Sequence, residues 1–165
     1  MTTTAALTRD IGQAERTLRA LLERTLNDSG LSFSDWTVLV FLDDAGLLAG
    51  SELIQRQVDG RVAPEAAART TVDGLRASGL IATADETDGP AARSTEGEDP
   101  LLTLTPAGQS VYQPVRQSVL RIMGEIYGDL PAADLEATHR TLAEVARRAH
   151  ELLAPTRSMN VSTAP

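Results

Sequence analysis

Few residue types in this sequence could carry out catalysis. There is no cysteine, which excludes thiolate nucleophiles, disulfides and zinc sites built on sulfur. The only histidines, His139 and His150, lie eleven residues apart within one helical pattern, which separates them by about 16 Å, too far to share a metal ion. No Gly-x-Ser-x-Gly elbow is present, and without lysine a Gly-rich phosphate loop of the lysine type is impossible. We therefore expect a protein that is not an enzyme and has no cofactor or metal site.

The basic residues favour one kind of binding chemistry, because all 15 of them are Arg. Its planar guanidinium forms paired hydrogen bonds with phosphates and guanine edges. The total charge argues against a general polyanion-binding surface, since 23 acidic residues bring the net charge to −8. The acidity is concentrated in residues 83–104, where six acids face only Arg93, whereas residues 51–82 are neutral. The charge of that neutral segment does not oppose contact with a nucleic acid.

The size and composition of the chain indicate one globular unit. Its 165 residues, 42% hydrophobic and 23% charged, correspond to about one domain with a buried core. No stretch reaches the ~18 apolar residues of a membrane-spanning helix, and the start lacks the layout of a secretory signal. We therefore expect a cytoplasmic protein.

The spacing of apolar residues predicts a mainly α-helical fold with one small β-hairpin. A Ser-x-x-Asp capping box at Ser32 and Asp35 marks one helix start, and Pro64 and Pro106 suit the first turns of two others. Two short β-prone runs surround a long polar connection. The expected helices cover residues 8–28, 33–45, 52–58, 64–78, 106–127 and 131–153, and the β-prone runs cover 80–82 and 101–104.

This order of elements and several motifs resemble the MarR family of bacterial transcriptional regulators. The matching residues are Leu31-Ser32 with Trp36 and Leu39, Glu52-Leu53, Arg69-Thr70-Thr71-Val72-Asp73-Gly74-Leu75, Gly79-Leu80-Ile81 and Leu104-Thr105-Pro106-Ala107-Gly108. The resemblance covers residues 7–153.

The resemblance implies a winged helix-turn-helix with long terminal dimerisation helices. It places a DNA-binding lobe at about 31–104 and dimerisation helices at about 7–28 and 106–153. Outside this domain we expect a flexible start over 1–6 and a disordered tail over 154–165, which has little to bury. It also implies a homodimer that binds a double-stranded operator, typically as a repressor, and that is released by a small aromatic or lipophilic effector. The effector would bind between the dimerisation helices and the DNA-binding lobe.

The resemblance assigns candidate contacts to both ligands. The candidates for DNA contact are Arg56, Arg61, Arg69, Thr70 and Arg93. Arg69 would lie on the recognition helix, and the Thr70 hydroxyl could bind a phosphate. Solvated surface positions are the alternative for the arginines. The candidates for the effector pocket are Trp36, Tyr112 and Tyr127, because aromatic residues make up only 3% of the chain. Packing in the core or at the dimer interface is their alternative.

The wing, which is the predicted hairpin over residues 80–104, departs from the family pattern. Thr83 and Ala84 follow the Gly-Leu-Ile run where relatives carry a basic residue, and no Arg follows Asp88-Gly89. An acidic wing would be repelled by phosphates. The start of the recognition helix, with Ala63, Glu65 and Ala66, also offers few groups that read bases. The sequence therefore leaves open a second hypothesis, a MarR-like protein with weakened or lost DNA binding whose acidic wing contacts a protein partner.

Overall fold

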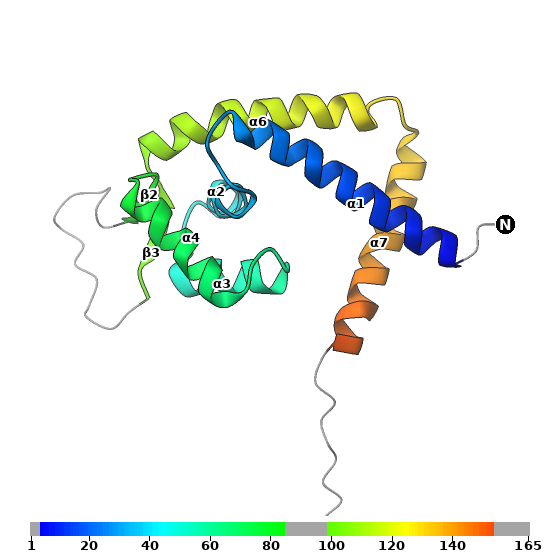
Figure 1. Cartoon of the computed structure of the whole chain (residues 1–165), viewed down its shortest axis with the longest axis horizontal. Coiled ribbons are helices and arrows are strands. Elements are labelled where there is room, and N and C mark those ends of the chain that lie inside the picture. Colours follow the sequence, from blue (N-terminus) through cyan, green and yellow to red (C-terminus); the bar gives the residue numbers. More distant parts are fainter. Residues whose placement is uncertain (1–3, 85–98, 154–165) are drawn as a thin grey trace, which may run out of the picture. The chain divides into compact units, whose positions relative to one another are not determined.

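The computed structural model describes residues 4–84 and 99–153 (Figure 1). The chain divides into two compact units, Met1–Ile122 and Met123–Pro165. The predicted wing tip with Arg93 and the tail after Leu153 lie outside the described residues. None of the described helices is long and apolar enough to cross a lipid bilayer.

All six predicted helices are present. The bounds of the elements are α1 Thr4–Asn27, α2 Phe33–Ala45, β1 Leu48–Ala49, α3 Gly50–Asp59, α4 Glu65–Ala77, β2 Ile81–Thr83, β3 Leu101–Leu104, α6 Pro106–Tyr127 and α7 Ala132–Leu153. Helix α1 begins four residues earlier than expected, so residues 4–6 are helical. Helix α3 begins two residues earlier, directly after β1.

The ends of α2 follow the sequence signals. The Ser32 hydroxyl accepts a hydrogen bond from the Asp35 backbone N–H at 3.1 Å, and the Asp35 carboxylate accepts one from the Ser32 N–H at 2.9 Å. This reciprocal pair satisfies two backbone donors that the first turn of a helix leaves free. Gly46 ends the helix with φ 76°, a left-handed conformation that glycine adopts without strain. The predicted capping box is confirmed.

The predicted hairpin is part of a three-stranded antiparallel sheet with the order β1-β3-β2. Leu102 of β3 pairs with Leu48 of β1 on one side and with Thr83 of β2 on the other. The sequence does not reveal β1, because two residues cannot show the alternation of apolar and polar side chains that marks a strand.

One hydrophobic core holds the first unit together. It is built by the inward faces of α2, α3 and α4, by all three strands, and by the C-terminal end of α1 and the N-terminal half of α6. Gly108 in the first turn of α6 lies against the Leu80 carbonyl, where a β-carbon would overlap it. The close approach fixes the start of α6 beside the wing. In the second unit, α7 has no buried residue.

Candidate nucleic-acid interface and ligand groove

Helix α4 follows α3 through a tight turn, as the second helix of a helix-turn-helix does. Gly60 ends α3, and Arg61 takes a left-handed conformation with φ 54°. Pro64 then precedes the first turn of α4. The side chains of Ala68, Val72 and Leu75 are buried, so α4 packs on the core through one stripe. The opposite face of α4 is left exposed.

The predicted DNA-contacting arginines of α3 and α4 are paired with glutamates. Arg69 lies 3.2 Å from Glu65, four residues earlier on α4, and Arg56 lies 2.7 Å from Glu52, four residues earlier on α3. Pairs at this spacing on exposed helix faces contribute only about 0.3–0.5 kcal/mol. A stronger partner such as a phosphate could therefore displace either glutamate. Arg56 also stacks over the Phe41 ring, 5.7 Å from its centre.

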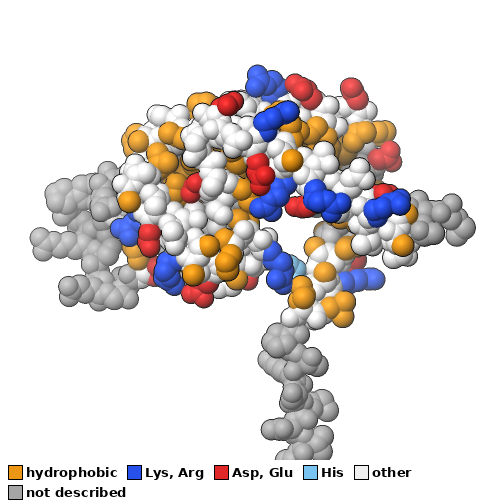
Figure 2. Space-filling view, in the orientation of Figure 1, with side chains coloured by type: hydrophobic (Ala, Val, Ile, Leu, Met, Phe, Trp, Pro, Cys, Tyr) orange, Lys and Arg blue, Asp and Glu red, His pale blue; other side chains and the backbone are white. Residues whose placement is uncertain are grey.

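The exposed residues of α4 line a groove that we call the α3–α4 groove. Its volume is about 330 Å³, and its walls are the first turns of α3, the exposed face of α4 and the segment leading into β3. Figure 2 shows acidic and basic side chains interspersed over this part of the surface. The charged residues that line the groove are Glu65, Arg69, Asp73, Arg76 and Asp99. Because side chains of both signs line the groove, it is better suited to individual hydrogen bonds with polar groups of a ligand than to long-range attraction of a uniformly charged polymer.

Two further predicted DNA contacts, Arg61 and Thr70, lie in the turn before α4 and on α4 itself. Arg61 is exposed in the turn between α3 and α4. Thr70 is exposed on α4, but its hydroxyl already donates a hydrogen bond to the Ala66 carbonyl at 3.0 Å. Arg56, Arg61, Arg69 and Thr70 thus belong to one helix-turn-helix. Their contact with DNA stays a prediction.

Asp99 is a residue that the sequence analysis counted only for its charge. Its carboxylate accepts a hydrogen bond from the Ser51 backbone N–H at 2.9 Å, across 48 residues of sequence. A carboxylate at the start of a helix satisfies a free N–H and interacts favourably with the helix dipole. Asp99 therefore holds the base of the wing against α3. A distant acid cannot be recognised as a cap from sequence.

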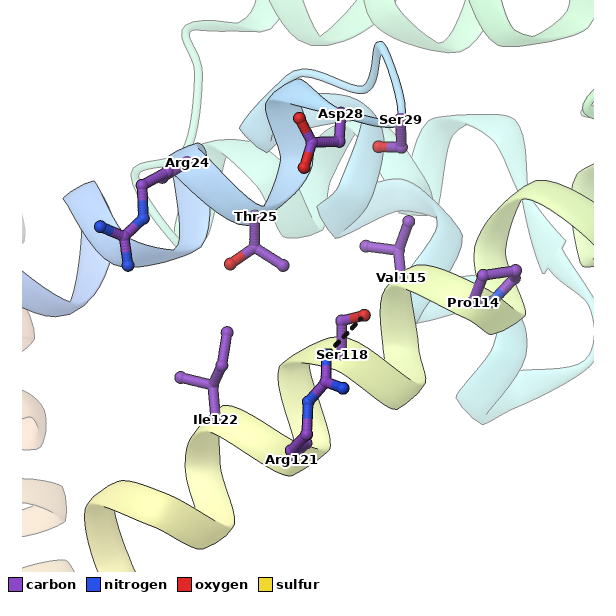
Figure 3. Close-up of a pocket in the computed structure, with 9 residues that line it drawn as sticks. All are labelled: Arg24, Thr25, Asp28, Ser29, Pro114, Val115, Ser118, Arg121 and Ile122. Carbon is purple, nitrogen blue, oxygen red and sulfur yellow. Dashed lines mark hydrogen bonds between the residues drawn. The ribbon is translucent and has the colours of Figure 1, made fainter.

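A second groove lies between α1 and α6, and we call it the α1–α6 groove (Figure 3). Its volume is about 500 Å³. In Figure 3, Thr25 and Ile122 point into the space between the two helices, and Arg121 lies along α6 beside Ser118. The Arg121 guanidinium is 3.5 Å from the Ser118 hydroxyl. The groove combines apolar side chains and hydroxyl groups with charged residues of both signs, Arg24, Arg121 and Asp28.

The predicted aromatic pocket residues do not line this groove. The rings of Trp36 and Tyr112 pack on each other in the core, with centres 5.1 Å apart. Burial, and then the charge and hydrogen bond of Asp43, raise the pKa of Tyr112 to about 12. Tyr127 belongs to the second unit and is half-buried. The role of these residues in ligand binding stays a prediction.

The residues of the α1–α6 groove are not among those predicted from the sequence. Two signals were present: Thr25 interrupts the apolar stripe of α1, and Ser118 and Arg121 flank the apolar residues of α6. Among the described residues, no group of three or more His, Asp or Glu side chains is placed to hold a metal ion.

No protein-family model and no curated protein sequence matches the chain. Solved structures do match. The MarR of Staphylococcus aureus, in complex with salicylate and kanamycin, has a TM-score of 0.70 at 18% identity, over 91% of each chain. A MarR family transcriptional regulator from Silicibacter pomeroyi has a TM-score of 0.69 at 17% identity, over 89% of this chain and 91% of that one.

A third structure contains nucleic acid. A mutant MarR from E. coli, complexed with operator DNA, has a TM-score of 0.63 at 18% identity and covers 84% of this chain and 92% of that one. At these identities the likeness concerns the fold. The chain has the winged helix-turn-helix fold of the MarR family of transcriptional regulators.

Proposed function

We propose that the protein is a homodimeric DNA-binding transcriptional regulator, acting as a repressor that a small effector releases. The observation that carries the proposal is the exposed face of α4, with Arg69, directly after a turn that carries Arg61. A recognition helix presented in this way can enter a major groove while the preceding helix contacts the backbone. The fold is also that of a MarR bound to operator DNA.

Exposed apolar side chains support the homodimer. In the second unit, Leu142, Val145, Leu152 and Leu153 are 41%, 45%, 87% and 61% exposed, and α7 buries no residue. In the first unit, Leu7 of α1 and Leu120 of α6 are also exposed. Helices with exposed apolar faces gain stability when a second copy covers them. Sedimentation should give about twice the chain mass of 17.5 kDa.

The α1–α6 groove supports binding of an aromatic acid as the effector. Val115 and Ile122 offer apolar contacts to a ring, and Arg24 and Arg121, which outnumber the one lining acid Asp28, can bind a carboxylate. The S. aureus MarR structure contains salicylate, which is such an acid. An effector that binds better to a DNA-incompetent arrangement of the helices shifts the protein toward that arrangement and weakens operator binding.

The first test is binding of the purified protein to the intergenic DNA beside its own gene, measured over a salt titration. We expect retention that weakens with salt, because phosphate contacts release counterions. Arg69→Ala should weaken binding by about tenfold. The exposed Arg140→Ala on α7 is the matched control and should leave affinity unchanged. Failure of the wild type to retain any duplex at low salt would refute the proposal.

The effector has a separate test. Salicylate is titrated into the protein–DNA complex, and we expect the apparent Kd for DNA to rise. Arg121→Ala should remove this response and leave DNA binding intact, because the groove is separate from α4. A response that persists in Arg121→Ala would show that the effector binds elsewhere.

The acidic wing over residues 83–104 and the mixed charge of the α3–α4 groove favour a second candidate function, in which DNA binding is weakened or lost and the wing contacts a protein partner. One triple variant separates the two: Asp85, Glu86 and Asp88, which lie outside the described residues, are all changed to Lys. The DNA-binding proposal predicts tighter operator binding, because repulsion of phosphates is removed. The alternative predicts no DNA binding in either form and weaker binding of the partner.

A further inference from the structure

The first two turns of α4 carry only a few polar side chains. Within this described segment the polar side chains are those of Glu65, Arg69, Thr70 and Thr71. Both threonine hydroxyls donate to the backbone of α4 itself, to the Ala66 and Ala67 carbonyls at 3.0 and 3.1 Å. Glu65 and Arg69 remain, with 71% and 61% of their side chains exposed. They are the charged side chains of this segment and the longest ones that it presents to a ligand.

These two side chains have complementary base-reading chemistry. A carboxylate can accept a hydrogen bond from the cytosine amine, and a guanidinium donates a pair of hydrogen bonds to the acceptor edge of guanine. The N-terminal residues of a recognition helix are those that contact base edges. Glu65 is the first residue of α4, and Arg69 lies one turn later on the same face.

We infer that Glu65 and Arg69 together read a cytosine and a guanine in the same or neighbouring base pairs of each operator half-site, an inference that rests on the proposed DNA-binding function. Residues four apart on a helix stand about 5–6 Å apart at their β-carbons, and base pairs stack about 3.4 Å apart, so both side chains reach within one step. In the free protein the two groups contact each other at 3.2 Å, and both line the α3–α4 groove. When DNA binds, each side chain gives up its contact with the other and forms hydrogen bonds with a base instead.

Glu65 also explains how an acidic protein could bind DNA selectively. A carboxylate at this position repels phosphates and therefore weakens binding to every duplex. The lost binding free energy is recovered only at sites where a cytosine amine donates a hydrogen bond to the carboxylate. Removing the charge while keeping the shape, as in Glu65→Gln, should therefore tighten binding to random DNA and reduce the preference for cytosine. A residue that only stabilises the start of the helix would change the melting temperature without changing the choice of base.

The test is selection of binding sites from a randomised duplex library by the full-length protein. The wild type should select half-sites with a fixed cytosine and guanine in the same or adjacent pairs. Glu65→Gln should lose the preference at the cytosine position by about tenfold and keep the rest of the site. Arg69→Ala should lose the guanine instead.

Glu52→Gln is the matched control, because Glu52 pairs with Arg56 at the same spacing on α3 and not on α4. It should leave the selected sequence unchanged. A selected site without the paired cytosine and guanine, or one that Glu65→Gln leaves intact, would overturn the inference while the DNA-binding function stands. Recovery of no sequence by the wild type would overturn both. Melting temperatures of all variants, measured first, confirm that each is folded.

Discussion

Gln57 is a polar residue on the buried face of α3, and its replacement should stabilise the protein. Its side chain is fully buried, in a stripe with Gly50, Leu53 and Ile54. Neither its amide nitrogen nor its amide oxygen has a hydrogen-bond partner among the described residues. An amide that leaves water without a new partner loses hydrogen bonds that the unfolded chain keeps.

The size of the effect follows from this loss. An unsatisfied buried polar group costs about 1–3 kcal/mol. Methionine has the same unbranched length as glutamine and carries no amide, so Gln57→Met should raise the free energy of unfolding by about 2 kcal/mol. For a chain of this size the melting temperature should rise by about 4–8 °C. Gln57→Glu should do the opposite, by about 3 kcal/mol or more, because it buries an unpaired charge.

Urea unfolding followed by circular dichroism measures the change, at one protein concentration so that assembly contributes equally. Gln55→Met is the matched control, since Gln55 is exposed on the same helix and its amide donates to Asp59 at 2.8 Å. It should change stability by less than about 0.5 kcal/mol. If Gln57→Met unfolds at the same or a lower urea concentration than the wild type, the amide of Gln57 is satisfied in the native protein and the reasoning is wrong.

Three further perturbations test other parts of the fold. Because burial and Asp43 raise the pKa of Tyr112 to about 12, the unfolded chain loses the phenol proton near pH 10 while the folded chain keeps it. Stability that is present below pH 10 should fall by about 2 kcal/mol between pH 10 and 12, and urea titrations should show a smaller fall for Tyr112→Phe. Gly108→Ala should destabilise by about 2 kcal/mol or more in thermal melts, because the new methyl group overlaps the Leu80 carbonyl. Asp99→Ala should lower stability by about 1 kcal/mol, and hydrogen exchange should speed up at the first turn of α3, since the cap is lost.

The sequence predicted the helices well because their signals are local. The capping box at Ser32, the prolines before α4 and within the start of α6, and the apolar spacing of three and four all act within a few residues. The resemblance motifs then led to the correct fold. The missed strand β1 has only two residues and exists because β3 pairs with it. Its formation depends on a segment about 50 residues later, which no local pattern reveals.

The candidate sites could be predicted only in part. The sequence determined which residues are arginine and that Arg69 follows Glu65 by one helical turn, so their pairing on one face was set as soon as the helix formed. The burial of Trp36 against Tyr112, the orphaned amide of Gln57 and the capping of α3 by Asp99 were decided by the tertiary structure. The physical reason is that burial and long-range hydrogen bonds depend on which surfaces meet. Helix periodicity fixes the face on which a side chain lies, and only packing decides what that face touches.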